Sequence, residues 1–208
     1  MATPKGVPAE PAFELTGGAL CLDFANTLDQ RPTDYPKEML PDYRRLLSWA
    51  EQAGALGEAE AAKLAVRAER SRAGATRVLG RARGLREAIF AIFAAAVRAQ
   101  APPRDGVRTL NQAIRDAFRR LELQPRGGAY RWQWLSEPGN LEAPLWPVVR
   151  SAADLMTSPD LARVRVCNAP NCDWLFLDHS KNQTRRWCDM KTCGNRDKAR
   201  RFRAARKA

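Results

Sequence analysis

Four cysteines near the carboxyl end of the chain constrain its fold more than any other feature. They form two pairs, Cys167 with Cys172 and Cys188 with Cys193, and each pair encloses four residues. Fifteen residues separate the pairs. The segment that holds them, from Arg163 onward, is close to the size below which a folded unit needs a metal or disulfides.

These cysteines predict one structural Zn²⁺, because four thiolates are a common ligand set for this ion. Two disulfides or a redox pair are the alternatives. Redox motifs typically enclose two residues between the cysteines, and neither pair does so. The leader Met1–Glu10 lacks the apolar core of a signal peptide. We therefore expect a cytoplasmic protein, in which paired cysteines bind metal more often than they form disulfides.

The residues around the cysteines predict a treble-clef-like zinc finger. Asn168–Asn171 has strong turn chemistry, which suits a loop between two ligands. Asp173–Asp178 has the composition of a strand, and Thr184–Trp187 is the expected returning strand. The second cysteine pair opens a basic, helix-prone segment. The finger is thus expected to consist of a β-hairpin followed by a basic helix.

The positive charge of the chain is concentrated in this finger. From residue 163 onward there are thirteen Lys and Arg against four Asp and Glu, a balance of +9, whereas the first 162 residues have a balance of only +3. A basic module beside a nearly neutral domain is typical of a polyanion-binding appendage. The alternative is a basic face that is only solvated.

One face of the final helix collects most of the candidate DNA contacts. At 3.6 residues per turn, four basic side chains share a narrow stripe. These are Arg196, Arg200, Arg203 and Lys207. Such a stripe suits contacts to phosphates or to the major groove. Arg185 and Arg186 on the hairpin are further candidates, while Arg196 could instead bond across the finger. Ala199, Phe202 and Ala205 fall on another side and are expected to pack against the hairpin.

The chain before the finger is expected to form a mainly helical domain over residues 13–158, after a disordered leader at 1–12. The predicted helices span residues 19–28, 40–53, 58–68, 75–100, 107–121 and 144–156. Between the last two, alternating residues around a Gly-Gly turn predict a β-hairpin over 121–135. With the finger at 159–208, the fold class is α+β, mainly α.

Three polar residues in the first predicted helix are unusual beside its apolar positions: Asp23, Asn26 and Thr27. They form either a buried polar network or part of a ligand pocket. No catalytic arrangement is recognisable in the helical domain, so we do not expect an enzyme. The domain could instead bind a small-molecule effector or form a homodimer. No apolar run reaches the length of a membrane span, so no membrane partner is expected.

The sequence also resembles a known family. Cys193–Arg196 (CGNR), together with Trp174–Asp178, Arg185–Cys188 and Lys198–Arg203, is similar to bacterial CGNR zinc-finger proteins. Many of these carry an N-terminal ABATE domain, which Gly17–Thr27 resembles. The resemblance implies a transcription regulator that binds double-stranded DNA through the finger, and therefore a location at the nucleoid when bound.

Two other functions remain open. A zinc-stabilised RNA- or protein-binding adaptor would have the same charge pattern, although RNA recognition favours exposed aromatic residues. A treble-clef nuclease would need an open metal position with histidine or carboxylate ligands, whereas His179 is the only histidine. The DNA-binding regulator is therefore the main expectation.

Overall fold

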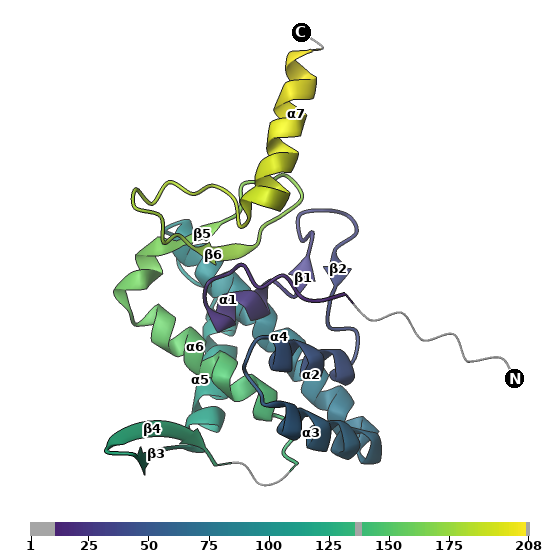
Figure 1. Cartoon of the computed structure of the whole chain (residues 1–208), viewed down its shortest axis with the longest axis vertical. Coiled ribbons are helices and arrows are strands. Elements are labelled where there is room, and N and C mark those ends of the chain that lie inside the picture. The colour runs from purple at the N-terminus through teal and green to yellow at the C-terminus, as the bar shows by residue number, and fades with distance from the viewer. Residues whose placement is uncertain (1–10, 136–138, 207–208) are drawn as a thin grey trace, which may run out of the picture.

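The computed structural model describes residues 11–135 and 139–206 (Figure 1). The helices are α1 (Leu20–Ala25), α2 (Tyr43–Gln52), α3 (Glu58–Arg70), α4 (Arg72–Val97), α5 (Arg104–Phe118), α6 (Trp146–Met156) and α7 (Asn195–Ala205), with shorter turns η1 (Ala143–Leu145), η2 (Pro159–Arg163) and η3 (Met190–Gly194). The strands are β1 (Leu28–Asp29), β2 (Lys37–Glu38), β3 (Leu121–Arg126), β4 (Ala129–Trp134), β5 (Val164–Val166) and β6 (Leu175–Leu177). The predicted class, α+β and mainly α, is confirmed. Residues 1–10 of the predicted leader lie outside the described residues.

Helix α4 is the central element of the helical part. Its apolar residues recur every three or four positions, so that Leu85, Ile89 and Phe93 form one fully buried stripe. Helices α1, α2, α3 and α5 all contact α4. Phe24 of α1 and Trp49 of α2 pack against each other in the same core, with tilted rings whose centroids lie 5.0 Å apart.

The first predicted helix is shorter than expected. It ends at Ala25, and Leu28 belongs to β1, where it pairs with Glu38 of β2. The chain turns sharply at Gln30, whose φ of 55° lies in the left-handed region. The spacing of Leu28 after Phe24 therefore matches a helix by coincidence.

The hairpin predicted over residues 121–135 is confirmed. Strands β3 and β4 pair from Leu121 opposite Trp134 to Arg126 opposite Ala129. Gly127 and Gly128 form the turn with φ values of 58° and 81°. Two successive positive φ values define the tight turn whose twist matches a hairpin, and glycine adopts them without steric cost.

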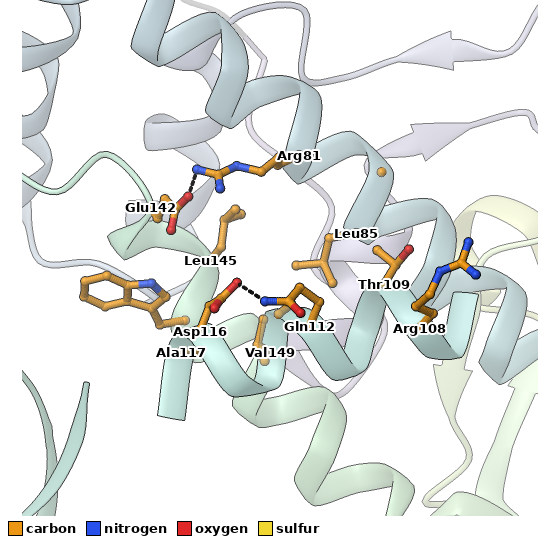
Figure 2. A pocket seen from close by; sticks show the side chains of 13 residues that line it. Arg81, Leu85, Arg108, Thr109, Gln112, Asp116, Ala117, Glu142, Leu145 and Val149 are labelled. Carbon is orange, nitrogen blue, oxygen red and sulfur yellow. Dashed lines mark hydrogen bonds and ion pairs between the residues drawn. The ribbon is translucent and has the colours of Figure 1, made fainter. Parts of the chain in front are cut away.

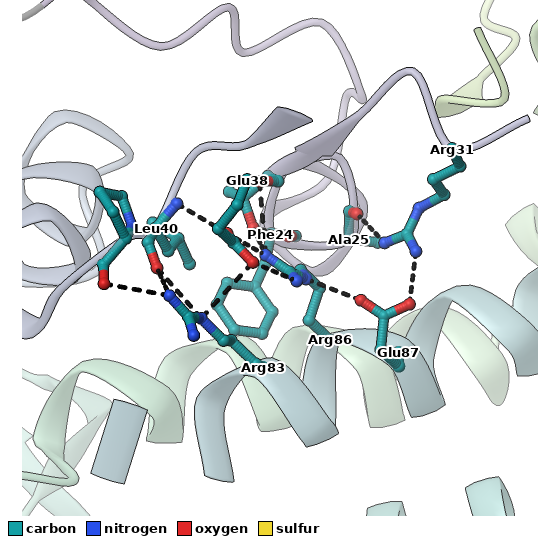
Figure 3. Close-up of polar contacts among 10 residues, drawn as sticks. Phe24, Ala25, Arg31, Glu38, Leu40, Arg83, Arg86 and Glu87 are labelled. Carbon is teal, nitrogen blue, oxygen red and sulfur yellow. Dashed lines mark hydrogen bonds and ion pairs between the residues drawn. The ribbon is translucent and has the colours of Figure 1, made fainter. Parts of the chain in front are cut away.

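A buried arginine fastens β2 to α4 (Figure 3). The Arg86 side chain is 3% exposed and donates to both carboxylate oxygens of Glu38 over 2.6 and 2.8 Å. Its Nε donates to Glu87 over 2.9 Å. Burial alone would raise the pKa of Glu38, but the hydrogen bonds from Arg86 and from the Leu40 N–H, together with the charge of Arg86, outweigh it and lower that pKa. Arg83, one turn before, donates to the Leu40 carbonyl over 2.7 Å.

The finger hairpin packs on the helical part. Both α1 and α4 contact β6, and α4 also contacts β5. Val164, Leu175 and Leu177 are buried in the same apolar core as α4. Asn26, which is 2% exposed, donates from Nδ2 to the Leu175 carbonyl over 2.9 Å and accepts the Leu175 N–H over 2.8 Å. The division at residue 159 stays a prediction, since the core is continuous across it.

Candidate metal centre and nucleic-acid interface

The four predicted zinc ligands come together in one buried cluster. Their sulfur atoms all lie within 4.8 Å of one another. The Sγ of Cys188 is 3.8 Å from that of Cys172 and 3.7 Å from that of Cys193. Disulfide sulfurs lie only about 2.05 Å apart. Four thiolates about 2.3 Å from a central zinc ion would lie about 3.8 Å apart in a tetrahedron. The cluster therefore fits one structural zinc ion, as predicted.

Local backbone geometry aims the four thiols at a common point. The first pair lies on the loop between β5 and β6, where the Cys172 N–H donates to the Ala169 carbonyl over 3.0 Å. The Cys167 N–H donates to the Trp174 carbonyl over 2.9 Å and closes this loop. Of the second pair, Cys188 lies two residues before η3 and Cys193 lies within it, and the Asp189 side chain caps this turn by accepting the Thr192 N–H over 2.7 Å.

The protonation of the thiols also suits a cation at the centre. Hydrogen bonding among the clustered thiols lowers the pKa of Cys167 and raises the pKa values of Cys172 and Cys188. Burial raises the pKa of Cys193. Four neighbouring thiolates thus repel one another, so the cluster alone does not ionise fully at neutral pH. A divalent cation at the centre would offset this repulsion by stabilising all four negative charges.

The hairpin of the finger is made of different strands from those predicted. β6 lies inside the expected strand 173–178, but its partner is β5, with Val164 opposite Leu177. Thr184–Trp187 was expected to be the returning strand and is not one. Instead the Arg185 N–H donates to Asp178 Oδ2 over 2.9 Å, and the Asn168 N–H donates to the Arg186 carbonyl over 2.9 Å. Isolated bonds of this kind anchor the segment without forming a ladder.

Helix α7 begins at Asn195, two residues after Cys193, and projects away from the body of the protein (Figure 1). No residue of its described span is buried. Phe202 is 64% exposed, so the expected packing of its face against the hairpin is wrong. The helix leaves the finger at its first turn, and its later turns have no surface to pack against.

Three of the four predicted stripe residues are exposed on α7, and all three line one groove beside the metal centre: Arg196, Arg200 and Arg203. The groove has a volume of about 450 Å³, and the loop residues Ala169–Asn171 form its other wall. Arg200 donates to Asp197 over 2.7 Å, and the pKa of Asp197 is lowered by this bond. Lys207 lies outside the described residues.

The two predicted contacts outside α7 differ from each other. The Arg185 guanidinium points into the finger, donates to the carbonyls of Trp187 and Cys188, and lies 4.6 Å from the Phe176 ring centroid. Arg186 is exposed, with its guanidinium 5.6 Å from the Trp187 ring. Arg185 therefore has a structural role that spacing did not reveal, whereas Arg186 remains accessible.

The comparison with known families agrees with this geometry. The family model described as "ABATE: Putative stress-induced transcription regulator" matches residues 18–159, and that of the CGNR zinc finger matches residues 163–206. The chain belongs to the ABATE family. No curated protein matches its sequence significantly. Among residues 11–135 and 139–206, no helix combines the length and apolarity needed to cross a membrane.

The three polar residues of the ABATE part make internal hydrogen bonds. Asp23 Oδ1 accepts the Gly17 N–H over 2.7 Å, and burial raises the pKa of Asp23 to about 6. Thr27 Oγ1 donates to the Phe24 carbonyl over 2.7 Å. Asn26 holds β6 of the finger, as described above. Each of the three side chains thus bonds to backbone groups of its own, and the choice between a buried polar network and a ligand pocket stays a prediction.

A separate cavity of about 570 Å³ lies elsewhere in the ABATE part, between α4, α5 and α6 (Figure 2). Leu85, Leu145 and Val149 supply apolar lining, and polar side chains surround them. Two polar pairs are part of this lining: Arg81 forms an ion pair with Glu142, and Gln112 donates to Asp116 over 3.0 Å. The volume is typical of small-molecule sites. Sequence reasoning missed this cavity because its lining comes from three helices and the η1 turn.

Proposed function

We propose that this protein is a zinc-containing transcriptional regulator that binds double-stranded DNA through α7. The observation that carries the proposal is the exposure of α7: the helix starts two residues after the zinc ligand Cys193, projects from the body and is arginine-rich. The zinc centre would fix the direction of the helix. The family description supports the role in transcription.

The chemistry of α7 suits a DNA groove. A helix of 11 residues is about 16 Å long, and the major groove admits an α-helix. Like charges one turn apart cost a helix a few tenths of a kcal/mol, so the arginine stripe does not serve folding. Asp197 offsets part of the charge by pairing with Arg200 and Arg201. Phosphates would compete for these arginines, and the exposed Phe202 could contact a thymine methyl group.

The ABATE part would regulate the finger. It would either bind a small-molecule effector, for which the cavity between α4, α5 and α6 is the best site, or bring two copies together. α4 lines that cavity and also contacts β5 and β6, so a ligand there would act on a helix that supports the finger. In this proposal the protein works in the cytoplasm, at the nucleoid when bound to DNA.

A catalytic role is not part of the proposal. Nucleases and other zinc hydrolases keep an open coordination position for water. The four cysteines would complete a tetrahedral shell and leave no such position. A purely structural ion matches this ligand set.

Fluorescence anisotropy with duplex DNA over a range of salt concentrations tests the proposal. The variant Arg196→Ala/Arg200→Ala/Arg203→Ala should weaken binding and reduce the salt slope by about 2 to 3, because each phosphate contact contributes about 0.9. The control Arg70→Ala/Arg72→Ala/Arg77→Ala removes equal charge from exposed positions of the ABATE part. Equal losses in both variants, or preference for RNA in competition, would contradict DNA recognition by α7.

A further inference from the structure

The β3–β4 hairpin has one wholly apolar face. Successive side chains of a strand point to opposite faces of the sheet. The register therefore places three residues of β3 and three of β4 on the same face. This side carries Leu121, Leu123, Pro125, Tyr130, Trp132 and Trp134. The other side carries Glu122, Gln124, Arg126, Ala129, Arg131 and Gln133. The hairpin is thus as amphipathic as a strand pair that covers a core.

Only the base of this face is covered. Trp134 packs against Trp146 of α6 with ring centroids 5.9 Å apart. Farther out, the Arg150 guanidinium lies 5.0 Å from the Trp132 ring, and Trp132 is still 49% exposed. Toward the turn, Leu123 is 53% and Tyr130 73% exposed. The hairpin extends from the body at the end remote from α7 (Figure 1).

Such an exposed face is costly for an isolated two-stranded sheet. Two strands alone are marginally stable in water, and both outer edges of this hairpin lack a neighbouring strand among the described residues. Together with Phe118, which is 39% exposed, the outer apolar residues expose about 400 Å². The largest apolar patch of a monomeric protein is about this size, and it is often a functional surface.

We propose that the apolar face of the β3–β4 hairpin is the surface through which two copies of this chain associate. Two such patches would bury about 800 Å² of apolar surface. Since apolar atoms form about 60% of an interface, the total would be about 1,300 Å², at the lower end of the range for specific protein–protein interfaces. A two-fold contact requires a self-complementary patch, and an apolar strip meets this requirement.

The charges around the strip also suit a second copy. Arg150 and Asp154 lie 3.4 Å apart beside Trp132 and Phe118, so the rim carries both signs. A copy related by a two-fold axis would present the same pair, and each charge could find its opposite. The inference rests on the dimerisation option of the proposed function. The hairpin is remote from α7, so association would leave both basic helices exposed (Figure 1).

Sedimentation velocity of the zinc-loaded full chain, without DNA, tests the inference. Over about 1 to 100 µM, in which even weak interfaces of this size associate, the wild type should form dimers. Leu123→Glu/Tyr130→Glu should weaken association at least a hundredfold, because it would bury charges in the interface. Arg131→Glu, on the polar face between Tyr130 and Trp132, is the matched control and should stay dimeric.

A measurement on the unmodified chain covers the case in which the glutamate variant does not fold. Hydrogen exchange at residues 121–134 should slow as the concentration of the wild type rises, while exchange in α7 should not change. Any one of three results would overturn the inference. The wild type could stay monomeric throughout the concentration range, the double variant could still dimerise, or hydrogen exchange in the hairpin could be independent of concentration. None of these results depends on DNA binding, so the two proposals can fail separately.

Discussion

Replacing Asn26 with alanine should break the polar contact between α1 and the zinc finger. The Asn26 amide satisfies both the N–H and the carbonyl of Leu175, a residue that is completely buried. In Asn26→Ala these two backbone groups lose their side-chain partner in a site that water does not reach. The penalty for an unsatisfied buried polar group is about 1 to 3 kcal/mol. The free energy of unfolding should therefore fall by about 2 to 6 kcal/mol.

Urea unfolding of the zinc-loaded protein, followed by circular dichroism, measures this loss. With a denaturant slope of about 2 to 3 kcal/mol/M, the midpoint should fall by about 1 to 2 M. Thr27→Val is the matched control, since Thr27 is equally buried but makes no bond to the finger. Its hydroxyl donates to the Phe24 carbonyl within its own turn and accepts a long 3.5 Å bond from Arg86 of α4. It should cost about 1 kcal/mol. Equal losses in both variants would refute a specific role of Asn26 in joining the finger to α1.

Three further predictions concern the metal, pH and a helix glycine. Cys193→Ser should reduce bound zinc well below one ion per chain and unfold the finger, because metal binding and folding are coupled. Elemental analysis measures the bound zinc and NMR the folding of the finger. A variant that still binds one zinc ion and keeps a folded finger would contradict this prediction. Because the pKa of Asp23 is raised to about 6, the native state holds this proton more tightly than the unfolded chain. Stability should therefore fall by about 1 kcal/mol from about pH 5 to about pH 7.5, and an unchanged pH dependence in Asp23→Asn would count against this cause. Gly84→Ala should raise the free energy of unfolding by about 0.5 to 1 kcal/mol, because alanine favours a helix and a Cβ at this position meets nothing within 4 Å. At Gly17 a Cβ would lie 2.9 Å from the Asp23 nitrogen, so Gly17→Ala should destabilise the protein. Thermal unfolding of the two variants checks both signs.

The parts of the fold that follow from short-range patterns are predictable from the sequence. The zinc ligands belong to this class, since each pair lies on one short segment and four thiolates suit few other roles. The β3–β4 hairpin does too, because alternation on both sides of Gly127 and Gly128 specifies register and turn together. The positions of the long helices follow from the spacing of their apolar residues, although their ends shift by several residues.

The errors come from contacts that a local pattern does not contain. Phe202 lies in an amphipathic pattern. Such a pattern shows that a helix has an apolar face that it could bury, but it does not show that another part of the protein lies close enough to cover that face. Arg185 has the composition of a surface contact, yet nearby carbonyls and the Phe176 ring draw it inward. The bond from Asn26 to Leu175 spans 149 positions and has no signature in either segment. Arg86 is similar, since the carboxylate that pairs with it inside the protein belongs to Glu38 of β2, 48 positions away.

Site-specific photocrosslinking tests most directly whether the zinc-held α7 is the DNA-contacting element. A benzoylphenylalanine at position 202 replaces an exposed residue of α7, and the same probe at position 130 reports on the remote hairpin. With zinc bound, the probe at 202 should crosslink duplex DNA, and chelation should abolish the product. Crosslinks from position 130 but not from 202, or crosslinks at 202 that persist after verified zinc removal, would contradict the account.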